Sequence, residues 1–299
     1  MRRFRPPDRE DRARAIGSLG DLPEPLARAF TPADDFAPIP EPGPSDWLSQ
    51  HDEPGQTFAD FKSGDFPKPG RVHRFLYLQP IGSFASEGSP RLEELERFAV
   101  AFFSGVEVRC KPPLKASEID IGSRKNPIAG NRQLLTTDIL RLLHSRLPAD
   151  AYCMLGITMT DLYPEPSWNF VFGQASPRKG VGVYSFARYD PAFYGREDPK
   201  KRTSLLMRRS CKVLAHETGH MFNLAHCIHF HCVMNGSNHL QESDARPMHL
   251  CPVCLRKLHQ ALGFDAVERY VKLLDFWKSW DYASEVRWQQ SRIDHIRAR

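Results

Sequence analysis

The pattern of apolar and polar residues changes near residue 70. Before that point prolines interrupt almost every apolar run, and the first 70 residues hold twelve of the 25 prolines in the chain. The stretch from Pro38 to Pro44 contains four of them and fits neither a helix nor a central strand. We therefore predict that residues 1–70 form an extended, partly disordered leader whose aromatic side chains can dock on a folded body.

Beyond residue 70 the apolar positions follow the periods of strands and helices. Short runs rich in β-branched and aromatic residues predict strands at 75–78, 106–110, 152–159, 169–172 and 181–187. Longer runs with helical spacing predict helices at 91–103, 132–146, 200–222, 252–262 and 265–280. Their alternation favours a mixed sheet with helices packed on it. We expect one compact domain over residues 71–280 and a charged helical tail over residues 281–299.

The helix predicted over residues 200–222 carries the sequence His216-Glu217-Thr218-Gly219-His220. Residues four apart lie on one face of an α-helix, so His216 and His220 can present imidazole nitrogens to one ion. Glu217 lies about 100° further round the helix and suits a general base acting on a metal-bound water. Zinc is typical of this arrangement, and it lowers the pKa of its bound water toward about 7.

His226 is the third candidate ligand of this ion. On a continuous helix its side chain would point away from the face of His216, so the helix must break between His220 and His226. Asn223 stands where the break is needed, and asparagine is second to glycine in tolerating a left-handed helix end. The expected cost relative to glycine is about 1 kcal/mol or less.

Other histidines follow close behind: His229, His231, His239 and His249. Each is more typical of a surface histidine than of a ligand. His229 or His231 is the substitute if His226 does not bind the metal.

Four cysteines predict a second metal site: Cys227, Cys232, Cys251 and Cys254. Four residues separate the first pair, two separate the second, and 18 residues join the pairs. This spacing is typical of closed, structural four-cysteine zinc sites. The alternatives are four unrelated buried thiols or a redox Cys-x-x-Cys motif, which would lack a second pair. The remaining cysteines lie in apolar surroundings and are predicted to be inert core residues: Cys110, Cys153 and Cys211.

Composition and charge narrow the class of protein without identifying it. The chain is 41% hydrophobic and 26% charged, which is ordinary for a globular protein. Its net charge of +5 is too small to imply nucleic-acid binding. No apolar run follows the basic N-terminus and none reaches about 18 residues, so we expect neither secretion nor a membrane span. Metal-like cysteine spacing suits a reducing compartment, the cytoplasm or also the nucleus.

The combined pattern His-Glu-x-x-His-x-x-Asn-x-x-His-Cys-x4-Cys-x-Met, followed by Cys-Pro-x-Cys, resembles the archaemetzincin family in its animal-type branch. The stretches at 232–240 and 251–258 are also similar to that family, as is Leu78-Gln79-Pro80-Ile81-Gly82. The resemblance spans about residues 72–270.

The resemblance implies a metzincin-like α/β zincin fold: a mixed, twisted sheet, an active-site helix and a zinc-clamped C-terminal helical part. It implies two zinc ions per chain. The catalytic zinc is on His216, His220 and His226, and the structural zinc is on the four cysteines. Met234 takes the place of the methionine that packs under the catalytic metal without binding it. Residues 71–280 then form the catalytic domain. Members of the family are classed as metallopeptidases, and animal members are described as aminopeptidases.

We therefore expect a zinc metallopeptidase, of the aminopeptidase type on short peptides, in which Glu217 activates a zinc-bound water. An edge strand at residues 169–172 is expected to pair with the extended peptide substrate. The alternative is a catalytically weak or inactive zinc-binding protein that acts as an interaction module. Asn223 in place of glycine motivates the idea of lost turnover, whereas an interaction module would bind protein or nucleic acid through its cysteine cluster and basic tail.

Overall fold

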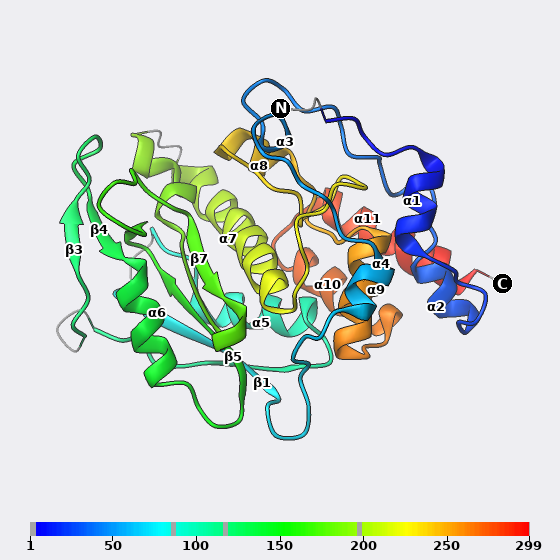
Figure 1. Ribbon diagram of the computed structural model, residues 1–299, viewed down its shortest axis with the longest axis horizontal. Helices are drawn as coiled ribbons and strands as arrows, with labels where there is room; N and C mark the ends of the chain where they lie inside the picture. Colours follow the sequence, from blue (N-terminus) through cyan, green and yellow to red (C-terminus); the bar gives the residue numbers. More distant parts are fainter. Residues whose placement is uncertain (1–3, 85–87, 116–118, 196–198, 299) are drawn as a thin grey trace. The chain divides into compact units, whose positions relative to one another are not determined.

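The computed structural model describes residues 4–84, 88–115, 119–195 and 199–298 (Figure 1). The chain forms two compact units. One consists of Pro67–Met221 and is called the sheet unit. The other consists of Met1–Phe66 together with Phe222–Arg299 and is called the helical unit. Among the described residues, no helix is both long enough and apolar enough to cross a membrane.

The sheet unit is built on a mixed five-stranded sheet with the strand order β2-β1-β5-β8-β7. Its strands are β1 (Phe75–Ile81), β2 (Glu107–Cys110), β5 (Ala151–Thr158), β7 (Gly173–Ser176) and β8 (Val181–Ser185). All neighbours are parallel except β7, which runs antiparallel to β8 at the edge. The central strands are buried along almost their whole length, as expected for parallel strands covered on both faces.

Three helices accompany this sheet: α5 (Leu92–Phe102), α6 (Thr136–Ser145) and α7 (Pro199–Met221). Phe75, Tyr77 and Ile81 of β1 pack with α6 in one core cluster. Strand alternation places the buried Leu76 and Leu78 on the opposite face. The side chain of Met221 lies against Gly182 of β8, so α7 ends on the sheet. Short 3-10 turns complete the unit: η2 (Pro177–Lys179), η3 (Ala187–Tyr189) and η4 (Pro191–Tyr194).

A second, three-stranded sheet has the order β3-β4-β6. Its strands are β3 (Ser123–Lys125), β4 (Arg132–Leu135) and β6 (Asp161–Tyr163). The helix predicted over residues 132–146 was wrong at its start. Residues 132–135 form strand β4, of which residues 133–135 pair with β6, and α6 begins only after them. The strand predicted over residues 169–172 was also wrong. There the structure has a single bridge between Leu162 and Val171, and the regular strand follows at β7.

The helical unit holds eight helices within its described residues. They are α1 (Arg9–Ile16), α2 (Glu24–Ala29), α3 (Trp47–Gln50), α4 (Phe58–Ser63), α8 (Leu240–Ala245), α9 (Pro252–Leu262), α10 (Ala266–Lys278) and α11 (Ala283–Arg297). The predicted helices near the C-terminus are confirmed. The predicted charged tail is helical as well, and its Ile293 and Ile296 are buried.

The expected extended leader and the expected domain boundaries differ from the structure. The described residues 4–66 form four short helices between the prolines and belong to the same unit as the C-terminal part. In Figure 1 the blue α2 lies beside the red α11. Phe36 packs edge-on against Trp288 of α11, with ring centroids 5.6 Å apart. The neighbouring Asp35 accepts a bond of 3.1 Å from the buried Arg292. Apolar side chains scattered among the prolines thus find a common core, which no local periodicity reveals.

Candidate metal centres

The C-terminal end of α7 carries His216 and His220. Their Nε2 atoms lie 3.1 Å apart, and the two rings are almost perpendicular. His216 is buried, with 7% of its surface exposed, and His220 is half-buried. Two nitrogen ligands of a tetrahedral zinc, at Zn–N distances of about 2.0–2.1 Å, lie about 3.3 Å apart. The helix alone therefore sets this pair at the separation that zinc requires.

Glu217 follows on the same turn of α7 and is half-buried. Around it the helix is packed tightly, since Ala215 and Thr218 are fully buried. Tyr184 of β8 lies nearby: burial, and then the charge of Glu217, raise the pKa of this phenol well above its ordinary value. Tyr184 is therefore a neutral neighbour of the Glu217 carboxylate.

The helix ends as the sequence predicts. The hydroxyl of Tyr152 donates to the Met221 carbonyl over 2.8 Å and so occupies one of the acceptors left open at the end of α7. In the helical unit, Asn223 has a φ of 62°, which is the left-handed conformation expected of it. Its carbonyl accepts a bond of 3.2 Å from the side chain of Gln56.

His226 lies in the helical unit and is half-buried. Its Nδ1 is 2.7 Å from Oε1 of Glu53, and the Trp47 ring packs edge-on against it at a centroid distance of 5.0 Å. The hydrogen bond with His226 is the main reason why the pKa of Glu53 lies below its usual value. Sequence reasoning missed Glu53, because it lies in the leader, 173 positions before its partner in the chain.

The four cysteines of the predicted second site lie together in the helical unit. One ligand atom from each lies within 4.8 Å of the others, and all four residues are buried. The Sγ atoms of Cys227 and Cys251 are 3.6 Å apart. That is too long for a disulfide, and close to the separation of about 3.8 Å between thiolates of a tetrahedral zinc with Zn–S bonds of about 2.3 Å.

Two backbone amides also donate to one of these sulfurs. The amides of Cys251 and Met234 donate to Sγ of Cys232 over 3.2 and 3.5 Å. Hydrogen bonds from the neighbouring thiols lower the pKa of Cys227 well below its ordinary value, whereas burial raises the pKa of Cys251 and the contact with Cys227 raises that of Cys254. The fit to a metal therefore rests on the geometry of the four sulfurs. The residues therefore fit a closed tetrathiolate site.

Asn235 fixes the turn between the two cysteine pairs through its side-chain hydrogen bonds. Its Nδ2 donates to the carbonyls of Cys227 and Phe230 over 2.7 and 2.9 Å. Its Oδ1 accepts from the amide of Cys232 over 2.7 Å. Met234 is fully buried beside it, and its carbonyl accepts from the Cys227 amide over 2.9 Å. The loop that carries Met234 is thereby fixed to the residue that follows His226.

The four other histidines of this region make contacts that stabilise the local fold. His239 caps α8 by accepting from the Glu242 amide over 3.1 Å, and its other nitrogen lies 3.0 Å from Asp46. His249 stacks on Trp288 at 3.7 Å. His229 is buried, and this burial lowers its pKa. The amide of His231 donates to the Ala37 carbonyl over 3.0 Å.

The remaining thiols lie in the sheet unit. Burial raises the pKa of all three, to about 12 for Cys110. Protonated thiols are poor nucleophiles and poor metal ligands.

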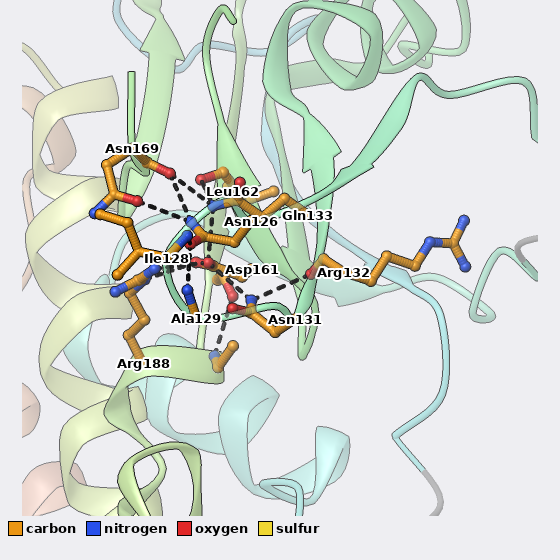
Figure 2. Close-up of polar contacts among 12 residues, drawn as sticks. Asn126, Ile128, Ala129, Asn131, Arg132, Gln133, Asp161, Leu162, Asn169 and Arg188 are labelled. Carbon is orange, nitrogen blue, oxygen red and sulfur yellow. Dashed lines mark hydrogen bonds and ion pairs between the residues drawn. The ribbon is translucent and has the colours of Figure 1, made fainter. Parts of the chain in front are cut away.

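A buried polar cluster lies at the second sheet of the sheet unit (Figure 2). The carboxylate of Asp161 pairs with the guanidinium of Arg188 through two bonds of 2.8 Å. Gln133 and Asn131 donate to the same carboxylate over 2.9 and 3.0 Å. The carbonyl of Asn169 accepts bonds of 2.9 Å from the side chains of both Asn126 and Gln133.

Backbone hydrogen bonds explain why residues 169–172 are not an open edge. The Val171 amide donates to Leu162 over 3.0 Å, and the Phe172 carbonyl accepts from Ser185 over 2.9 Å. In the described part of the five-stranded sheet, β7 is the edge strand on this side.

Comparison with known proteins places these residues in context. The sequence profile of peptidase family M54 matches residues 136–260. Archaemetzincin-2 of Macaca fascicularis is 44% identical over 276 residues, which cover 83% of this chain and 77% of the relative. Archaemetzincin-2 of Homo sapiens is 43% identical with the same coverage. The crystal structure of archaemetzincin from Methanopyrus kandleri is 32% identical and covers 66% of this chain and 99% of its own, with a TM-score of 0.47.

Proposed function

Because this chain belongs to the archaemetzincin family of zinc-dependent metallopeptidases, we propose that it hydrolyses peptide bonds at a zinc ion bound by His216, His220 and His226. The observation that carries this proposal is the pair of Nε2 atoms set 3.1 Å apart on α7. The left-handed Asn223 supports it, because a chain that reverses there can return His226 toward the helix end.

A zinc ion supplies Lewis-acid chemistry at such a site: it polarises the peptide carbonyl and lowers the pKa of a water molecule. Glu217 acts as the general base. Its carboxylate takes a proton from the attacking water and then delivers it to the nitrogen of the leaving amine. Its place on α7, one residue after a metal ligand, brings it beside the ion without making it a ligand.

The four cysteines bind a second zinc ion. Four thiolates fill a tetrahedral coordination shell and leave no position for water or substrate, so this ion is structural. It holds together the turn that carries Met234 and the start of α9.

The substrate is a peptide in extended conformation. Strand β7 is the antiparallel edge of the sheet beside α7, and its outer backbone groups can pair with such a peptide. We further propose that the enzyme is an aminopeptidase on short peptides, which follows from the similarity of the motif to the animal-type branch. Peptides with free and with acetylated N-termini distinguish an aminopeptidase from an endopeptidase, because an aminopeptidase leaves the acetylated peptides intact.

The decisive experiment combines metal counting with peptide turnover. We expect two zinc ions per chain in the wild type and in Glu217→Gln. Loss of the general base should lower turnover by about 10²–10⁴-fold in that variant. Glu107→Gln, which changes an exposed carboxylate of the sheet unit, is the matched control and should behave as the wild type. Full turnover in Glu217→Gln would refute the proposed mechanism.

A further inference from the structure

The leader segment from Trp47 to Gln56 reaches the stretch that contains His226. Within the helical unit, Oε1 of Glu53 lies 2.7 Å from Nδ1 of His226. Both side chains are about one-fifth exposed, at 19% and 20%. A contact this short between partly buried groups fixes the imidazole, since its Nδ1 must carry the proton that the carboxylate accepts.

Glu53 is itself held in place. The indole Nε1 of Trp47 donates to the same Oε1 over 2.7 Å. The backbone amide of Trp47 donates to Glu242 over 2.9 Å, which ties the start of α3 to α8. The Trp47 ring also packs edge-on against His226. Oε1 of Glu53 is therefore held by two groups, the indole of Trp47 and the ring of His226.

Gln56 fixes the backbone of the residues that precede His226 in the chain. Its Oε1 accepts from the Ala225 amide over 3.2 Å, and its Nε2 donates to the Asn223 carbonyl over 3.2 Å. The buried Lys257 of α9 donates to the same Oε1 over 3.0 Å. The leader thus holds both the backbone before His226 and the ring of His226.

Two glycines permit this close approach. A Cβ on Gly236 would collide with the Trp47 ring, so the leader rests on the loop that follows Met234. Gly55 has a φ of 74°, and a Cβ there would collide with Ile228. The leader is therefore fitted to the region around His226 at two independent points.

We propose that Glu53 is a positioning residue for the zinc ligand His226, and that the leader segment Trp47–Gln56 is a built part of the metal site. The proposal rests on the proposed function, in which His226 binds the catalytic ion. The carboxylate holds the proton on Nδ1 and so places the lone pair on Nε2, where it can face the metal. The ring thereby enters zinc binding already oriented.

The test measures zinc affinity at each site of the full chain, by competition with a chelating dye. The variants are Glu53→Ala, which removes the carboxylate, and Glu53→Gln, which keeps an acceptor oxygen. Glu10→Gln is the matched control, because it neutralises an exposed carboxylate of α1, outside the segment Trp47–Gln56. His226→Ala is the benchmark for loss of the ligand itself. Cobalt substitution provides a second readout, since nitrogen-bound and thiolate-bound cobalt differ in their visible spectra.

We expect Glu53→Ala to weaken one zinc site by about 10–100-fold and leave the thiolate site unchanged. Glu53→Gln should fall between Glu53→Ala and the wild type, and Glu10→Gln should match the wild type. The spectrum of nitrogen-bound cobalt should change more in Glu53→Ala than in Glu53→Gln, and it should stay unchanged in the control variant.

Wild-type affinity at both sites in Glu53→Ala would overturn the proposal while leaving the proposed function intact. Retention of both ions by His226→Ala would instead overturn the proposed ligand set, and the role of Glu53 with it. If Glu53→Ala loses the thiolate ion as well, the Glu53→Gln variant decides. Selective weakening of one site in Glu53→Gln supports the proposal, and any other result in that variant refutes it.

Discussion

At the residue scale, Asn223 determines how the chain leaves α7. Its φ of 62° lies in the region that side chains with a Cβ usually avoid, and asparagine tolerates it better than most. Glycine would adopt it without strain, whereas a β-branched side chain would not. The asparagine therefore costs little and does not by itself argue for an inactive protein.

We predict that Asn223→Gly keeps the stability of the wild type to within about 1 kcal/mol. Asn223→Val should be destabilised by about 1–2 kcal/mol, since the left-handed region excludes a branched Cβ. Thermal unfolding followed by circular dichroism, together with zinc content, compares the two variants. Equal melting temperatures for the glycine and valine variants would show that the backbone at this position is not fixed.

At the element scale, the polar cluster around Asp161 joins short segments of the chain that strand pairing alone would hold only weakly. Its side chains connect the β3–β4 hairpin, the start of β6 and the chain near Asn169 (Figure 2). Arg188 adds a contact with the Phe170 ring, with its guanidinium carbon 3.5 Å from the ring centroid. Short strands of three or four residues are thus stabilised by buried ionic and amide groups.

We predict that Asp161→Ala lowers the stability of the protein by about 3–5 kcal/mol, because the buried guanidinium of Arg188 loses its partner. The matched control is Arg141→Ala, which breaks an exposed pair with Asp138. That change should cost about 1 kcal/mol or less. Urea denaturation of both variants measures the difference. Similar losses in the two would contradict the assignment of a buried, structural ion pair.

The sequence predicted the elements that depend on local pattern. Helix α7, the strands β1, β5 and β8, and the reversal at Asn223 follow from periodicity and from residue preferences. It did not predict the positions whose structure or role depends on residues far away in the sequence. Residues 132–135 have a helical pattern, yet Asp161 and its neighbours draw Gln133 into a strand. Glu53 gives no local signal at all, because its role is defined by His226.

At the scale of the whole molecule, the two units differ in the interactions that stabilise each one internally. The sheet unit is built on a continuous buried sheet. The helical unit joins two distant parts of the chain through short helices, and its four cysteines lie in one buried cluster. Binding of a structural zinc supplies folding free energy directly, on the order of 10 kcal/mol in small zinc domains. The helical unit should therefore depend on metal far more than the sheet unit.

We predict that Cys254→Ser releases the structural zinc ion proposed above and raises amide hydrogen exchange throughout Phe222–Arg299 and in the leader. Exchange in the core of the sheet unit should stay close to that of the wild type, because its sheet does not rely on the cysteines. His226 should lose its position before His216 and His220, since it adjoins Cys227 whereas the other two are held by α7. Cys110→Ser, at a thiol outside the cluster, is the control. Hydrogen exchange measured by mass spectrometry gives the answer peptide by peptide, and an equal rise in both units would contradict the separation of their stabilities.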